Sequence, residues 1–218
     1  LIEDGGAKAF MKLGLAAFCV SARQTALRVC PECHRHQSCA VGIPTWLRSH
    51  QLPGSLVCSV HGLPLVTIPL RERGRHEFLC PPMDAPAQTP PAWNEGQRKI
   101  LWEIACRQAS LLDGTDRIRE LHEWLPHYRE LLASRALMRS ASKVDHPALQ
   151  DAVRNVLGDV LPFLPPACRN LEDGGWPSLL VRKHRKAMHP LFHVLISLVI
   201  DRTPTPANLA PLAASAPR

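Results

Sequence analysis

The chain has 218 residues, 45% of them hydrophobic and 21% charged, which is enough apolar material to bury a core in one large domain or two modest ones. Its formal net charge is +7 at pH 7, and this balance favours an anionic partner such as nucleic acid. The longest apolar run, from Pro190 to Ile200, is too short to span a bilayer, so we expect no membrane association.

The N-terminal residues 1–27 include a short apolar stretch, residues 7–20. Its periodicity leaves open whether it forms a strand or a helix. No secretory signal is recognised here, and several of the eight cysteines stand in metal-ligand pairs. This usage indicates a reducing cytoplasm and not a disulfide framework.

Residues 28–80 are predicted to form a zinc module. They carry two ligand pairs, Cys30-x2-Cys33 and Cys58-x2-His61, separated by 24 residues. Each pair can present two ligands from one tight turn, and together they complete the tetrahedral coordination that Zn²⁺ prefers. Because no position is left for a catalytic water, we expect one structural zinc ion and no enzyme activity.

The second ligand pair is expected at the tip of a β-hairpin. A strand leads into Cys58, a knuckle turn follows at His61-Gly62, and a second strand leaves through Leu65 and Val66. Gly62 suits this turn because a knuckle often needs a positive φ after a ligand. The module is therefore predicted to consist of small zinc-bound β-hairpins.

A linker is predicted for residues 81–97, which contain five prolines and no apolar period. Residues 98–202 show apolar residues at helical spacing, and we expect a helical DNA-binding region with helix-turn-helix character. Residues 203–218 form a tail rich in proline and alanine. The expected fold class is thus mainly α with a small zinc-bound β-hairpin module.

Several helix boundaries can be predicted within the helical region. A first helix ends at Asp113-Gly114, and a second is stopped or kinked at Pro126, with apolar residues continuing beyond it. A third opens at Asp145, an N-cap acid that precedes a proline in the first turn. The last is the apolar helix from Leu191 to Ile200.

A dense basic run lies just before this last helix. Clustered Arg and Lys side chains neutralise phosphates, although a solvated helix face is the alternative. Polar residues between the two ligand pairs can touch a nucleic acid, or can be packing and capping residues. The predicted DNA-contacting residues are Arg182, Lys183, Arg185, Lys186, Arg48 and His50.

The pair Asp145-His146 raises a second function class, a metal-dependent nuclease. Such a site needs a further histidine or asparagine at fixed distance on the following helix, and residues 147–165 contain no other histidine and only Asn155. The cap interpretation of Asp145 is therefore favoured, and metal-dependent strand cleavage would identify the nuclease.

Three segments in succession resemble the zinc-finger core of the TniQ/TnsD family of transposon target-site selectors. They are the C-P-x-C knuckle at Cys30, the W-x-R-x-H-Q-x-x-G segment from Trp46 to Gly54, and the C-x-x-H-G-x-x-L knuckle at Cys58. A block from Trp176 to Leu195, which includes His189-Pro190-Leu191, is similar to one in TnsD-like members.

The resemblance implies a protein that neither cuts nor joins DNA. It implies recognition of a target, either attachment-site DNA or a CRISPR guide-RNA effector complex, and recruitment of a TnsC-like AAA+ ATPase that brings the transposase. The zinc ligands carry over onto Cys30, Cys33, Cys58 and His61. It also implies that residues 1–27 are the remnant of an N-terminal TniQ segment, in a bacterial, nucleoid-associated protein.

Two departures from the family pattern limit what the resemblance implies. The usual N-terminal opening of the TniQ domain is missing, so partner contacts made there are not assigned. Cys80 has no mate for the second zinc knuckle of some guide-RNA-associated members, which favours the TnsD-like, direct DNA-reading branch. The adaptor to a CRISPR effector complex stays as the alternative. Strong salt dependence of DNA binding by the isolated protein would argue against that adaptor.

Overall fold

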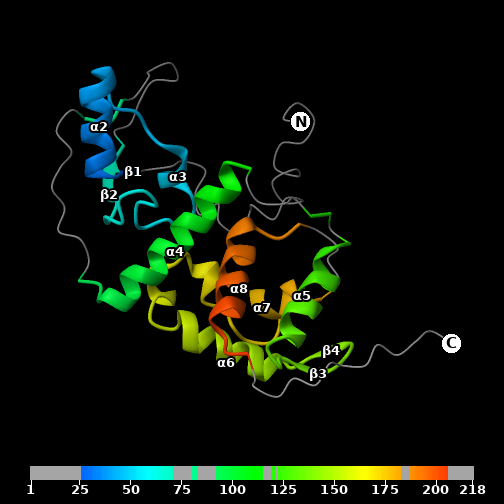
Figure 1. Cartoon of the computed structure of the whole chain (residues 1–218). Coiled ribbons are helices and arrows are strands. Elements are labelled where there is room, and N and C mark those ends of the chain that lie inside the picture. The colour runs from blue at the N-terminus through cyan, green and yellow to red at the C-terminus, as the bar shows by residue number, and fades with distance from the viewer. Residues whose placement is uncertain are drawn as a thin grey trace. The chain divides into compact units, whose positions relative to one another are not determined.

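The computed structural model describes residues 26–70, 80–82, 92–114, 119–120, 122–182 and 187–205 (Figure 1). The described residues divide into two compact units, one ending at Gly114 and the other starting at Arg119. The predicted N-terminal remnant, except for its last two residues, lies outside the described residues, as do the centre of the predicted linker and most of the predicted tail. None of the described helices is long and apolar enough to cross a membrane.

The first unit contains a two-stranded antiparallel sheet. Strand β1 (Ala26–Val29) pairs with β2 (Val66–Pro69), so that the first residue of one strand lies opposite the last residue of the other. Helix α2 (Pro31–Val41) begins directly after β1, with Cys30 as its N-cap and a proline in its first turn. It ends at Gly42, which has φ +78 and donates its N–H to the Ser38 carbonyl.

The β-hairpin predicted around the second ligand pair forms only in part. Gly62 has the expected positive φ of +65, and Val57 and Pro64 form an isolated antiparallel bridge on either side of the knuckle. The strand that follows starts only at Val66 and pairs with β1 instead of with the segment before Cys58. The sheet thus joins the two ends of the module.

Two helices complete the first unit, α3 (Arg48–Gln51) and α4 (Glu95–Leu112). Helix α4 opens with a capping box, in which Asn94 Oδ1 accepts from the Gln97 amide at 2.8 Å and Gln97 Oε1 accepts from the Asn94 amide at 2.9 Å. It ends before Asp113-Gly114, as predicted, and Gly114 has φ +70.

Helix α4 packs on the module that carries the ligand pairs. Its apolar stripe of Leu101, Ile104 and Ala105 is buried, Trp102 Nε1 donates to the Ser59 carbonyl at 3.0 Å, and Gln108 Nε2 donates to the Pro53 carbonyl at 2.7 Å. From the sequence, this helix is predicted to belong to the helical region that follows the linker. In the structure it belongs to the same compact unit as the sheet and α2.

The second unit is helical with one short hairpin. Its helix α5 starts at Trp124, so Pro126 lies in the first turn, where a proline is tolerated. Asp145 caps α6 by accepting the Ala148 amide at 3.3 Å, as predicted. The elements are α5 (Trp124–Ala133), β3 (Met138–Ser140), β4 (Lys143–Val144), α6 (His146–Leu157), η2 (Leu161–Phe163), η3 (Pro166–Cys168), α7 (Trp176–Leu180) and α8 (Pro190–Arg202).

Helix α8 is the centre of this second unit. Leu191, Leu195 and Leu198 are fully buried, and α6 and α7 both pack against the helix. A helix that is apolar on most of its surface is stable only when neighbours surround it. Within the described residues, the structure is mainly helical, with two small two-stranded sheets and a ligand cluster beside the first of them, which confirms the predicted fold class.

The C-terminal block that resembles TnsD-like members forms the framework of this core. Trp176 stacks on Phe192 with ring centroids 5.5 Å apart and donates its indole N–H to the Cys168 carbonyl at 2.9 Å. His189 caps α8 by accepting the Leu191 amide on Nδ1 at 3.1 Å. The block is therefore largely structural.

A further polar contact in this core joins α5 to α8. The Tyr128 hydroxyl and His193 Nδ1 are 2.6 Å apart, and the tyrosine is 1% exposed. The Trp124 ring lies 4.0 Å from the His193 ring, and burial raises the pKa of Tyr128 above its usual range. The hydroxyl therefore stays protonated at neutral pH.

Candidate metal centre

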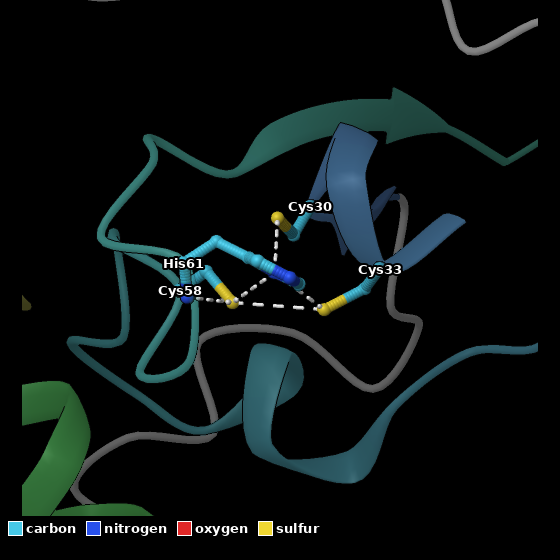
Figure 2. Close-up of side chains that lie close together, drawn as sticks. All are labelled: Cys30, Cys33, Cys58 and His61. Carbon is cyan, nitrogen blue, oxygen red and sulfur yellow. Dashed lines mark hydrogen bonds between the residues drawn. The ribbon is translucent and has the colours of Figure 1, made fainter. Parts of the chain in front are cut away.

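Three thiols and one imidazole converge at one point of the first unit (Figure 2). Cys30 and Cys33 come from the start of α2, and Cys58 and His61 come from the knuckle turn. Their ligand atoms all lie within 4.8 Å of one another. Among the described residues, these four form the group of metal-ligating side chains that can hold an ion, and they are the four predicted from the spacing.

The distances fit a tetrahedron around one metal ion. His61 Nδ1 lies 3.5 Å from Cys30 Sγ, 3.3 Å from Cys33 Sγ and 3.7 Å from Cys58 Sγ. The Cys33 and Cys58 sulfurs are 3.7 Å apart. A tetrahedral zinc site with ordinary bond lengths requires edges of about 3.6 Å between sulfur and nitrogen and about 3.8 Å between two sulfurs. Four of the six edges are close to these values and all six are within 4.8 Å, so the donor atoms can hold one metal ion.

Local backbone geometry sets each ligand pair. In the first pair, Cys30 is the N-cap of α2 and Cys33 lies one turn further along, so both sulfurs emerge at the same end of the helix. In the second pair, the Gly62 amide donates to the Cys58 carbonyl at 2.9 Å and the Cys58 amide donates to the Leu63 carbonyl at 2.8 Å. These bonds close the turn that brings His61 back over Cys58.

Electrostatics favour a bound cation. Burial, with the neighbouring Cys58 thiolate, raises the pKa of Cys33 to about 11. The hydrogen bond between Cys30 and Cys58 raises the pKa of Cys30 and lowers that of Cys58, because the two sulfurs share one proton. Three crowded thiols cannot all lose their protons at neutral pH unless a cation compensates the charge.

Helix α3 is fastened to β1 beside the cluster. The Gln51 side chain accepts the Arg28 amide at 2.9 Å and donates to the Arg28 carbonyl at 2.7 Å. The Arg28 guanidinium in turn donates to the carbonyls of Ser55 and Leu52 at 2.6 and 3.0 Å. The polar residues between the ligand pairs are expected either to touch a nucleic acid or to serve in packing. Gln51, in the W-x-R-x-H-Q segment, serves in packing. Arg28 was not singled out from the sequence, because an isolated arginine carries no spacing signal.

The predicted DNA-contacting residues are divided between the two units and the part of the chain outside the described residues. Arg48 is exposed in the first unit, and Arg182 is exposed in the second. His50 is 3% exposed, and its Nε2 lies 3.8 Å from Cys33 Sγ, so it reaches DNA only if α3 moves. Its DNA contact stays a prediction. The remaining residues of the basic run, Lys183, Arg185 and Lys186, lie outside the described residues.

The basic run is held at both ends by buried residues. Leu180 and Val181 precede Arg182 and are 0% and 4% exposed, and His189 follows the run at 6% exposed. The described residues on either side of the run therefore belong to the core of the second unit.

Two comparisons with known proteins agree with the motifs. A family model for the Tn7-like transposition protein D (TnsD) matches residues 104–203. The chain is also 28% identical over 202 residues to the transposon Tn7 transposition protein TnsD of Escherichia coli, a match that covers 85% of this chain and 36% of the relative. The chain thus spans little more than a third of that protein's length. The resemblance predicted from the motifs is confirmed: residues 104–203 match the TnsD family model, and the chain is similar to a TnsD protein.

Proposed function

We propose that this chain is the metal-binding and helical portion of a target-selection protein for a Tn7-like transposon. In this role it binds attachment-site DNA and recruits a TnsC-like AAA+ ATPase that regulates the transposase. The observation that carries the proposal is the TnsD family match, which covers most of the second unit and the C-terminal half of α4. The relative from the Tn7 transposon, aligned over 85% of the chain, supports the same role.

We propose zinc as the metal and a structural role for it. Three thiolates and one imidazole in tetrahedral reach of one another are typical of zinc. All four coordination positions are filled by protein side chains, which leaves none for an activated water. The ion would tie the start of α2 to the knuckle turn and so stabilise the first unit. This donor set supports a non-catalytic protein.

DNA contact is assigned in this proposal to the basic run and to Arg48. The chain carries a net charge of +7, and both Arg182 and Arg48 are exposed. Guanidinium and ammonium groups neutralise phosphates and release condensed counterions, which makes binding strongly dependent on salt. The ATPase would bind elsewhere on the chain, and its contact surface is left unassigned.

The test is DNA binding by the chain as a function of salt. Fluorescence anisotropy would be measured with a duplex from the transposon's insertion locus and with a scrambled duplex, for the parent and for the double variant Arg182→Glu, Arg185→Glu. The matched control is Arg154→Glu, since Arg154 is exposed in the same unit and paired with Asp151 at 2.8 Å.

The parent is expected to prefer the insertion locus, and its affinity should fall steeply with salt. The double variant should bind at least tenfold more weakly, and its slope of log K against log salt should be shallower by about 2, because each phosphate contact contributes about 0.9. An unchanged slope would remove the basic run from the DNA surface. Weak, salt-insensitive binding by the parent would favour the adaptor to a CRISPR effector complex.

A further inference from the structure

His50 is a polar side chain buried against the metal cluster. It is 3% exposed, and its Nε2 lies 3.8 Å from Cys33 Sγ. It is not one of the four residues that form the tetrahedron. Its place is immediately outside the ligands, where a side chain can act on the metal only through a ligand.

A loaded centre needs hydrogen-bond donors around its sulfurs. Three thiolates, a neutral imidazole and a divalent cation sum to −3 + 2, a net charge of −1. A buried negative charge is costly unless donors point at it. Sulfur ligands therefore accept hydrogen bonds from the protein around them, and these bonds set both affinity and orientation.

Two of the sulfurs have an identified donor. Cys58 Sγ accepts the His61 backbone amide at 3.5 Å. For the Cys33 sulfur, the donor outside the four ligands that the described residues provide is His50 Nε2. One thiolate thus uses a main-chain donor, and Cys33 uses a side chain.

We propose that His50 is a positioning residue of the metal centre, which donates a hydrogen bond from Nε2 to the Cys33 thiolate. A metal-bound thiolate can only accept, so the proton must reside on Nε2. The inference rests on the proposed metal centre and is independent of the proposed DNA contacts.

The framework around α3 places His50 for this role. Gln51 makes two hydrogen bonds to the backbone of Arg28, and the Arg28 guanidinium holds the chain after α3 through two carbonyls. Because β1 leads directly into Cys30, the same contacts fix His50 relative to the first ligand pair. The histidine and glutamine of the W-x-R-x-H-Q segment therefore act inside the molecule, and the arginine of that segment is the exposed member.

The experiment compares zinc binding and thiol reactivity in four proteins. The variants are His50→Leu, which removes the donor, His50→Gln, whose amide N–H can reach the same sulfur, and His36→Leu as the matched control. His36 is exposed, and its ring lies edge-to-face with His61 at 5.3 Å. Zinc affinity is measured by competition with a chromophoric chelator, and alkylation of Cys33 and Cys30 by iodoacetamide is followed by peptide mass spectrometry.

H50L is expected to bind zinc about tenfold more weakly, since outer-shell partners typically contribute 10- to 100-fold to metal affinity. Its Cys33 should be alkylated faster relative to Cys30, because the thiolate loses the donor that lowers its nucleophilicity. H50Q should stay within about threefold of the parent in affinity, and H36L should match the parent in both measurements.

Equal zinc affinity and an unchanged Cys33-to-Cys30 ratio in H50L would overturn the proposal. So would a uniform rise in alkylation of all the ligand cysteines, which signals loss of packing instead of loss of one donor. Should H50L fail to fold, the comparison passes to H50Q and H50N, because the asparagine amide is too short to reach Cys33. Equal affinities in that pair would also refute the role, whereas a parent that binds no zinc would refute the metal centre itself.

Discussion

Acid is expected to weaken the second unit through His189, the N-cap of α8. Its Nδ1 accepts the Leu191 amide, which requires a neutral ring, and burial lowers its pKa from 6.5 to about 4. The unfolded chain therefore takes up a proton near pH 6.5, whereas the folded chain takes it up only near pH 4. The stabilisation from this histidine is complete above pH 6.5 and is lost as the pH falls toward 4.

The magnitude follows from this difference in proton affinity. Each pH unit between the two pKa values corresponds to about 1.4 kcal/mol, so the free energy of unfolding should fall by at most about 2 kcal/mol between pH 7 and pH 5. Urea unfolding followed by far-ultraviolet circular dichroism at the two pH values measures the change.

The matched variant for this prediction is His189→Asn. Asparagine is a good N-cap that does not titrate, so the variant keeps the capping bond and loses the pH-dependent contribution. The other histidines and the metal centre also respond to acid, but they do so in both proteins and cancel in the comparison. The same loss of stability in parent and variant between pH 7 and pH 5 would refute the reasoning.

Two further predictions concern the two units separately. Leu195→Ala should lower the free energy of unfolding by about 2–5 kcal/mol, because Leu195 is fully buried in α8. Leu179→Ala, at a position 42% exposed, should lower it far less. Urea unfolding measures both changes, and similar losses of stability would contradict the packing of α8. Removal of the metal with EDTA should speed hydrogen exchange in α2 and α3 and leave exchange in α6 and α8 unchanged, which peptide-resolved mass spectrometry can follow. Unaltered exchange in α2 and α3 would mean that the ion is not structural.

Features encoded by a few neighbouring residues could be predicted from the sequence. The metal ligands stand in two short pairs, and the structure brings all four together. The cap at Asp145, the helix end at Asp113 and the positive φ of Gly62 depend on one to four residues each. Local signals of this kind survive folding because no distant partner is needed to satisfy them.

Features that depend on distant partners could not be predicted. The pairing of β1 with β2 joins segments on either side of the ligand pairs, and only the short bridge between Val57 and Pro64 is local to Gly62. The apolar stripe of α4 shows that the helix has a buried face without showing what covers it. The proline-rich segment before α4 predicts a domain boundary there. In the structure, hydrogen bonds from α4 to the carbonyls of Ser59 and Pro53 instead join the helix to the unit that carries the metal ligands.

The buried residues on either side of the basic run bear on how such proteins change targets. The run starts after Val181 and ends before His189, and both of these residues belong to the core that the rest of the unit already stabilises. New charges or lengths between these two anchors would place little strain on the helices. If the proposed DNA contacts lie in residues 182–188, we therefore expect substitutions there to alter DNA preference with little effect on the stability of α7 and α8.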